Sequence, residues 1–149
     1  MKDDLSKFIK TISNGSIKYS DPRKLDLNLI DKKVRGTIKS INSSNIVWTL
    51  WSCQGHKDKK GSTLPYITFV VKNSHIKDFL DLIFLSLPKY NSKIFPVTPN
   101  YYFTINRGYS NKKFTIISIH WCANYLNKIK NVNLYSDLSF ISKEIRKIK

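Results

Sequence analysis

The amino-acid sequence predicts a single α+β domain in which helices pack on one face of an antiparallel sheet. Segments rich in β-branched and aromatic residues come in two pairs, and a polar turn or loop joins the members of each pair. Segments with apolar residues at helical spacing stand before, between and after these pairs. The expected order is therefore helix, two strands, helix, two strands and helix, within one domain of residues 1–149.

The N-terminal part predicts a peripheral segment followed by a first long helix. Within residues 1–24, three apolar side chains share one face of a short helix: Phe8, Ile9 and Ile12. The longer helix is expected to begin at a cap on Asp26 or Asn28 and to end near Ile41, because valine and isoleucine recur along one stripe.

Two hairpins supply the predicted sheet. Ile46–Ser52 and Leu64–Lys72 are expected to be strands, and the polar loop Cys53–Thr63 joins them. Tyr101–Asn106 and Lys113–Trp121 form the second pair. Consecutive strands with a short connection are most simply antiparallel neighbours.

Two further helices complete the prediction. Ile76–Leu87 carries apolar residues at helical spacing, and Pro88 is expected to stop it. A polar stretch, Lys89–Asn100, follows. The segment Leu134–Lys149 predicts an amphipathic helix at the C-terminal end.

The charge balance predicts an anionic partner. Lysine and arginine total 26 against 10 acidic residues, which gives a net charge of +16. An AT-rich genome favours lysine codons, but it favours glutamate codons equally, and Glu144 is the only glutamate. Such a field attracts polyanions, so we expect a nucleotide or nucleic-acid partner, and a merely solvated surface is the alternative. Any planar, bidentate phosphate contact would fall to one of four arginines: Arg23, Arg35, Arg107 and Arg146.

Composition also argues against several classes of protein. No apolar run approaches the length of a membrane span, so no membrane partner is expected. The polar start predicts no secretory signal, and two cysteines do not make a disulfide framework. We therefore expect a cytoplasmic protein, located in the cytoplasm of the host cell if it is viral. Whether it forms a homo-oligomer is left open by the sequence. Walker, dinucleotide-binding and RNA-recognition-motif signatures are lacking, so no catalytic residue is assigned and a non-enzyme is favoured.

The loop after the first strand is the most distinctive candidate for a ligand-binding site. Lysines of this loop and an arginine of the second hairpin turn would meet phosphates, Trp51 or Tyr109 would stack on a base, and the loop start would shape the pocket. The predicted ligand-binding residues are Trp51, Ser52, Cys53, Gly55, His56, Lys57, Lys59, Lys60, Arg107 and Tyr109.

This region resembles the wybutosine-synthesis tRNA methyltransferase family, which carries a Thr-Ser-Ser-Cys-Ser-Gly-Arg segment after a comparable helix. It is also similar to small phage proteins with a Ser-Cys-x-Gly-His loop. The resemblance covers residues 31–71, and His56 replaces the family's arginine. It implies a pocket facing a nucleotide or RNA around Ser52–His56, and S-adenosylmethionine as cofactor if methyl transfer is shared. The matching residues are Ile38, Ile41, Asn42, Thr49, Ser52, Cys53 and Gly55.

Two further uses of these polar residues are considered. Zinc could bind four ligands if two strand ends meet: Cys53, His56, His120 and Cys122. The alternative is that Cys122 is a small core residue and His120 an edge residue. Cys53 and His56 could instead act as a thiolate and its base, although no third, orienting group is evident.

A basic and aromatic set surrounds the second hairpin and its neighbouring strands. Aromatic rings stack on bases while cations follow phosphates, as on sheet surfaces that hold single strands. The alternative is that many of these rings, the tryptophans above all, belong to the core. The residues are Tyr101, Tyr102, Arg107, Tyr109, Lys112, Lys113, Trp48, Trp51 and Trp121.

Together these observations favour a non-enzymatic protein that binds a nucleotide or nucleic acid, and no cofactor is expected outside the zinc and S-adenosylmethionine alternatives. The phage-like loop suggests a viral protein that sequesters a nucleotide signal or masks nucleic acid. The alternatives are an RNA-modifying enzyme and a basic protein that coats nucleic acid.

Overall fold

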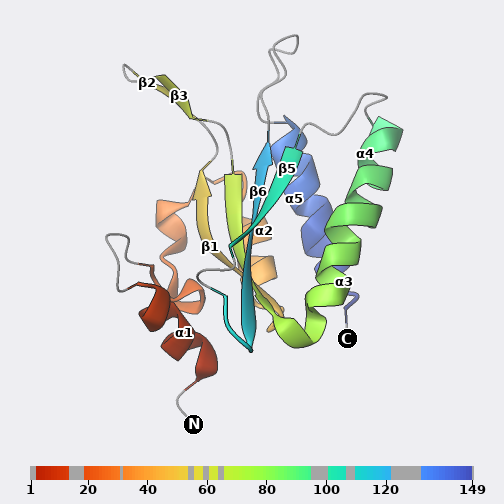
Figure 1. The fold of residues 1–149 in the computed structure, drawn as a ribbon. Helices are drawn as coiled ribbons and strands as arrows, with labels where there is room; N and C mark the ends of the chain where they lie inside the picture. The colour runs from red at the N-terminus through yellow and green to blue at the C-terminus, as the bar shows by residue number, and fades with distance from the viewer. Residues whose placement is uncertain are drawn as a thin grey trace.

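The computed structural model describes residues 3–13, 19–30, 32–53, 56–58, 61–63, 66–94, 101–106, 110–121 and 132–148. The protein is an α+β protein built on a four-stranded antiparallel sheet (Figure 1). Its helices are α1 (Asp4–Ile12), α2 (Arg35–Asn42), α3 (Ile76–Asp81), α4 (Leu87–Ile94) and α5 (Val132–Ile145). Its strands are β1 (Val47–Cys53), β2 (His56–Asp58), β3 (Gly61–Thr63), β4 (Tyr66–Lys72), β5 (Tyr101–Asn106) and β6 (Phe114–Trp121).

The sheet joins two hairpins side by side. The strand order is β1-β4-β6-β5, so β4 and β6 meet in the middle and β1 and β5 form the edges. All neighbours are antiparallel, and the β1–β4 and β5–β6 pairs are the two predicted hairpins. The strands β2 and β3 pair separately as a short ribbon that continues the β1–β4 hairpin beyond the sheet (Figure 1).

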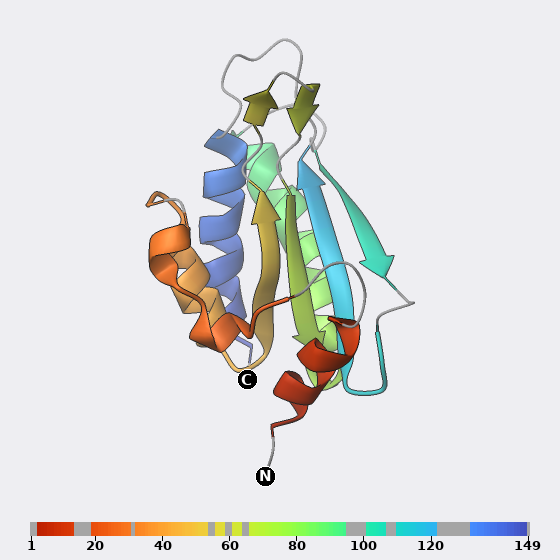
Figure 2. The same ribbon diagram turned by 90° about the vertical axis from the view of Figure 1, so that its left-hand side faces the viewer.

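One face of the sheet carries the larger core. Figures 1 and 2 show α2, α5 and the α3–α4 rod on this side of the strands. Phe69 of β4 packs edge-on against Phe79 of α3, with 5.4 Å between ring centroids. The central strands contribute fully buried residues to this core: Ile67, Phe69, Ile117 and Ile119.

The opposite face is covered at one end by α1, so the expectation that helices pack on one face only is wrong (Figure 2). Phe8 of α1 contacts Phe114 of β6 at 5.1 Å between ring centroids. At this end the central strands are apolar on both faces, because Val70 and Val71 are adjacent and both buried. Successive strand residues point to opposite faces, so a second layer is needed to bury one of them. Residues 1–24, predicted to be peripheral, thus contain a helix that packs on the sheet.

The first long helix is shorter than predicted. It begins at Arg35 rather than at Asp26 or Asn28, and 3₁₀ turns occupy Pro22–Lys24 and Leu27–Leu29. Asp26 does act as a cap, since its side chain accepts a hydrogen bond from the Asn28 N–H at 3.0 Å. That cap begins a single turn, so the isoleucine stripe identified the helix but not its start.

Pro88 does not stop the third predicted helix. The rod runs from α3 through a π-helical turn at Leu82–Ser86 into α4, which ends at Ile94. In the π turn the Leu87 N–H donates to the carbonyl of Leu82, five residues earlier. A π turn inserts one extra residue and shifts the preceding carbonyls, which relieves the clash that proline causes in a regular helix. The predicted loop Cys53–Thr63 likewise contains structure, namely β2 and β3.

Within the described ranges, none of the helices combines the length and the apolar character that crossing a membrane requires.

Candidate nucleic-acid interface

Beyond α1, the second sheet face presents a row of rings on three neighbouring strands. The strand register places Tyr66 of β4 opposite His120 of β6, and His120 opposite Tyr102 of β5. These residues alternate along their strands with the buried Ile67 and Ile119 of the helical face. They therefore lie on the face that α1 covers at its other end. We call Tyr66, His120 and Tyr102 the aromatic row.

The rings of the aromatic row are stacked on one another. The Tyr102 and His120 rings lie 4.7 Å apart between centroids and are inclined by only 8°. The Tyr66 ring lies 5.8 Å from His120, inclined by 27°. The stack ends at Tyr102, which belongs to an edge strand and is 49% exposed. One ring face of Tyr102 contacts His120, so its other face points away from the stack.

A row of hydroxyl groups lies next to the aromatic row. Thr68 of β4 and Ser118 of β6 share a hydrogen bond of 2.7 Å between their hydroxyl oxygens. Thr104 of β5 is opposite Ser118 in the register, and its hydroxyl lies 3.2 Å from Nε2 of His120. These side chains place donors and acceptors beside the rings, as recognition of base edges requires.

His120 is held as a neutral ring at neutral pH. Partial burial lowers its pKa below the ordinary value of 6.5, because burial disfavours the charged imidazolium. A neutral imidazole completes a flat, uncharged stack with the two tyrosines.

We expect NMR titration of the His120 ring to give a pKa below 6.5. An unfolded histidine takes up its proton near pH 6.5, whereas folded His120 does so only at lower pH. The free energy of unfolding should therefore fall as the pH drops below about 6.5 and level off below the folded pKa. In His120→Gln this part of the decline should disappear, and in the control His75→Gln it should persist. A measured His120 pKa at or above 6.5 would contradict the burial argument.

The structure describes the side chains of two of the three tryptophans considered for stacking, and both lie in the core, as the alternative predicts. Trp121 is buried and its indole N–H donates to Oδ2 of Asp137 at 2.7 Å. Trp48 is buried under α1. Tyr101 is half-buried against the helical core, whereas Tyr102 is exposed. Among the rings of this set whose side chains the structure describes, Tyr102 is the one on the exposed sheet face.

The predicted ligand-binding loop is described in part, and there only in its backbone. Trp51, Ser52 and Cys53 form the end of β1, and His56 and Lys57 belong to β2, opposite Thr63 and Ser62. Cys53 of β1 is opposite Tyr66 of β4, so it lies at the same level of the sheet as the aromatic row. The remaining predicted residues, Gly55, Lys59, Lys60, Arg107 and Tyr109, lie outside the described residues, so their roles stay predictions.

The predicted zinc ligands are only partly placed. Cys53 and His120 are both opposite Tyr66, one on each side, so two strand spacings of about 4.8 Å separate their backbones. Cys122 lies outside the described ranges. In the part of the chain that is described, no three histidine, cysteine or acidic side chains gather as a metal site would need. Zinc binding stays a prediction.

Tyr66, Thr68 and Ser118 were not singled out by sequence reasoning. The signal that could have found them is the alternation Tyr-Ile-Thr-Phe in β4 and Ile-Ser-Ile-His in β6. Each pattern places polar or aromatic residues on one face and apolar residues on the other.

The architecture defines an α+β protein with most of its helices on one sheet face, and with α1 and a partly uncovered aromatic row on the other. Comparison with protein-family models, with curated proteins and with solved structures found no match. The resemblance to the wybutosine-synthesis family therefore stays an expectation based on the residues that carry it.

Proposed function

We propose that this protein binds single-stranded nucleic acid, with an unpaired base continuing the stack of the aromatic row on the outer face of Tyr102. The observation that carries the proposal is the nearly parallel stack of Tyr102 on His120, which ends in an exposed ring at the sheet edge. A base has to be unpaired and accessible to stack in this way, which favours a single strand over a duplex.

The charge of the protein supports a polyanionic ligand. The net charge of +16 provides long-range attraction for the phosphate backbone. The ion pairs between described residues are exposed or partly exposed and include Lys77–Asp81 and Lys147–Glu144. With 26 cations and 10 acids in the chain, the acidic side chains can neutralise fewer than half of the positive charges.

We expect Tyr102→Ala to weaken binding of a fluorescein-labelled single-stranded oligonucleotide by about fivefold or more, since one stacked base contributes roughly 1–3 kcal/mol. Fluorescence anisotropy with RNA and with DNA measures the dissociation constants. The matched control is Ile105→Ala on the same strand, which is 46% exposed and lies on the helical face.

Equal affinities of Tyr102→Ala and the unmodified protein would refute the stacking proposal. Equal weakening in both variants would assign the effect to a disturbed β5 edge. Thermal unfolding of both variants shows whether the sheet is intact. If a duplex bound as tightly as a single strand, attraction to phosphates alone, and not base stacking, would explain the binding.

A further inference from the structure

A second candidate site lies at the other end of the same sheet face, where α1 meets the strands. The structure has a cavity of about 790 Å³ there, bounded by α1, the end of β4 and the start of β6. Phe114, at this cavity, and His120 of the aromatic row are six residues apart on β6. At about 3.4 Å per residue the two sites are separated by about 20 Å.

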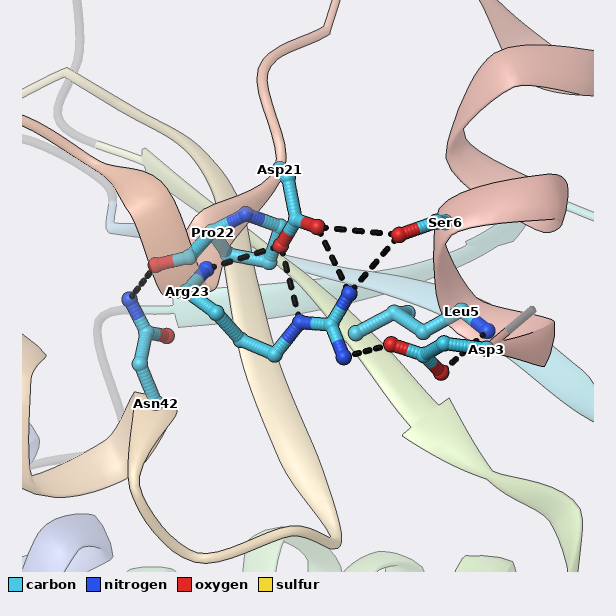
Figure 3. A network of polar contacts seen from close by, with 7 residues as sticks. All are labelled: Asp3, Leu5, Ser6, Asp21, Pro22, Arg23 and Asn42. Atoms are coloured by element: carbon cyan, nitrogen blue, oxygen red, sulfur yellow. Dashed lines mark hydrogen bonds and ion pairs between the residues drawn. The ribbon is translucent and has the colours of Figure 1, made fainter. Parts of the chain in front are cut away.

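The walls of the cavity are held by ion pairs. Arg23 binds both Asp21 and Asp3, and one of its nitrogens also donates to the hydroxyl of Ser6 at 2.8 Å (Figure 3). These contacts join the 3₁₀ turn at Pro22–Lys24 to the first turn of α1. Lys113, directly before β6, binds Asp4 of α1 at 2.7 Å. The hydrogen bond and charge of Lys113 lower the pKa of Asp4, so this carboxylate is ionised at neutral pH.

Three lysines of the cavity form no ion pair among the described residues, although the charge of Lys7 also acts on Asp4. Arg23 and Lys113 are neutralised by Asp3 and Asp4, the acidic residues of the lining. Among the described residues, no ion pair includes the other cations of the lining, which are Lys7, Lys72 and Lys112. Like charges gathered around one cavity repel one another, and a bound anion removes that repulsion.

The residues that line the cavity include a tryptophan whose buried donor lacks an acceptor. Trp48 lines the cavity and is only 3% exposed, and its indole nitrogen has no hydrogen-bond partner in the described part of the protein. An indole N–H can only donate, and buried donors are nearly always paired. The ammonium group of Lys72 lies over the same indole ring, 5.6 Å from its centroid. The same tryptophan of the cavity therefore has both a lysine ammonium group over its ring and an indole N–H without an acceptor.

We propose that this cavity binds a phosphate group, held by Lys7, Lys72 and Lys112 and by the indole N–H of Trp48. Phosphate oxygens accept hydrogen bonds from several donors at once. Their negative charge would give the three lysines the ion-pair partner that they do not have in the described residues. The indole nitrogen is buried and the Lys72 ammonium group lies over the ring, so the binding of the anion includes a movement of neighbouring side chains that opens the N–H to it. The inference does not rest on the proposed function, since the aromatic row takes no part in it.

The test is an NMR titration of ¹⁵N-labelled protein with pyrophosphate, at constant ionic strength maintained with potassium chloride. We expect a saturable shift of the Trp48 indole signal, assigned with Trp48→Phe, and no shift of the Trp121 signal, whose N–H is bonded to Asp137. No saturable shift of the Trp48 signal, or an equal shift with potassium chloride alone, would overturn the proposal.

A pair of double variants separates the cavity from the general field. We expect Lys72→Gln with Lys112→Gln to weaken pyrophosphate binding at least tenfold. The control, Lys39→Gln with Lys143→Gln, removes the same charge from exposed positions outside the cavity lining and should change affinity less than twofold. Equal weakening by both would assign binding to net charge and refute the site.

Oligonucleotides with and without a 5′-phosphate identify the source of the phosphate. Tighter binding of the phosphorylated strand, with a shift of the Trp48 signal, would assign the cavity to a nucleic-acid end. If pyrophosphate shifts the signal and the 5′-phosphate does not, the ligand is a small phosphate compound. If neither shifts it, the cavity is not a phosphate site.

Discussion

Phe8→Ala is expected to reduce the free energy of unfolding by about 3–5 kcal/mol, the usual cost of removing a buried phenylalanine side chain. Phe8 is 3% exposed and packs on Phe114, and both belong to the cluster that joins α1 to the sheet. Its loss leaves a cavity between α1 and the sheet. Urea denaturation followed by tryptophan fluorescence measures the change, because Trp48 lies in the same cluster.

The matched control for Phe8→Ala is Lys10→Ala on the exposed side of the same helix, where we expect a change within about 0.5 kcal/mol. If Phe8→Ala changed stability by less than about 1 kcal/mol, α1 would not fold cooperatively with the sheet. The cavity beside α1 would then lack a stable wall.

Asn42→Ala is expected to reduce the free energy of unfolding by roughly 2–4 kcal/mol, because several buried polar groups lose their partner together. The Asn42 carboxamide oxygen accepts from the backbone N–H of Thr49 at 2.8 Å and from its hydroxyl at 3.0 Å. Its nitrogen donates to the carbonyl of Pro22 at 3.1 Å (Figure 3). Asn42 thus joins α2 to β1 and to the turn that carries Arg23.

The irregularity of β1 explains why this contact matters. The pairing of β1 with β4 shifts between Thr49 and Trp51, and the side chain of Asn42 accepts from the Thr49 N–H there. A buried N–H without an acceptor costs about 1–3 kcal/mol.

Ser43→Ala, at the exposed neighbour of Asn42, serves as the control, with an expected change within about 0.5 kcal/mol. Thermal or urea unfolding of both variants makes the comparison. Similar stabilities of the Asn42 and Ser43 variants would show that water replaces the lost contacts.

The sheet strands were predictable because local residue types determine them. The four strands β1, β4, β5 and β6 consist largely of β-branched and aromatic residues, and their bounds differ from the predicted ones by two residues or fewer. The helix errors have a different origin. Asp26 caps a turn that could have continued as helix, and Pro88 lies in a rod whose π turn accommodates it. Both outcomes depend on packing that no local pattern records.

The candidate site was predictable only in part. Tyr102 was recognised as a ring on the second hairpin, and His120 as a polar residue on its last strand. Their stacking with Tyr66 depends on the pairing of β4 with β6, which joins residues 54 positions apart in the chain. Sequence spacing predicts which strands form hairpins, but it does not predict how two hairpins pair with each other.

By itself, the sequence determined the α+β class, the two hairpins and a strong positive charge, because these follow from residue types and from periodicity along the chain. Only the tertiary structure decided that α1 covers one end of the second face, that three rings of different strands stack beyond it, and that lysines line a cavity together with Trp48, whose indole N–H has no partner among the described residues. Each of these depends on strand register and on contacts between distant segments, where alternation of side chains across a paired strand decides which residues share a face.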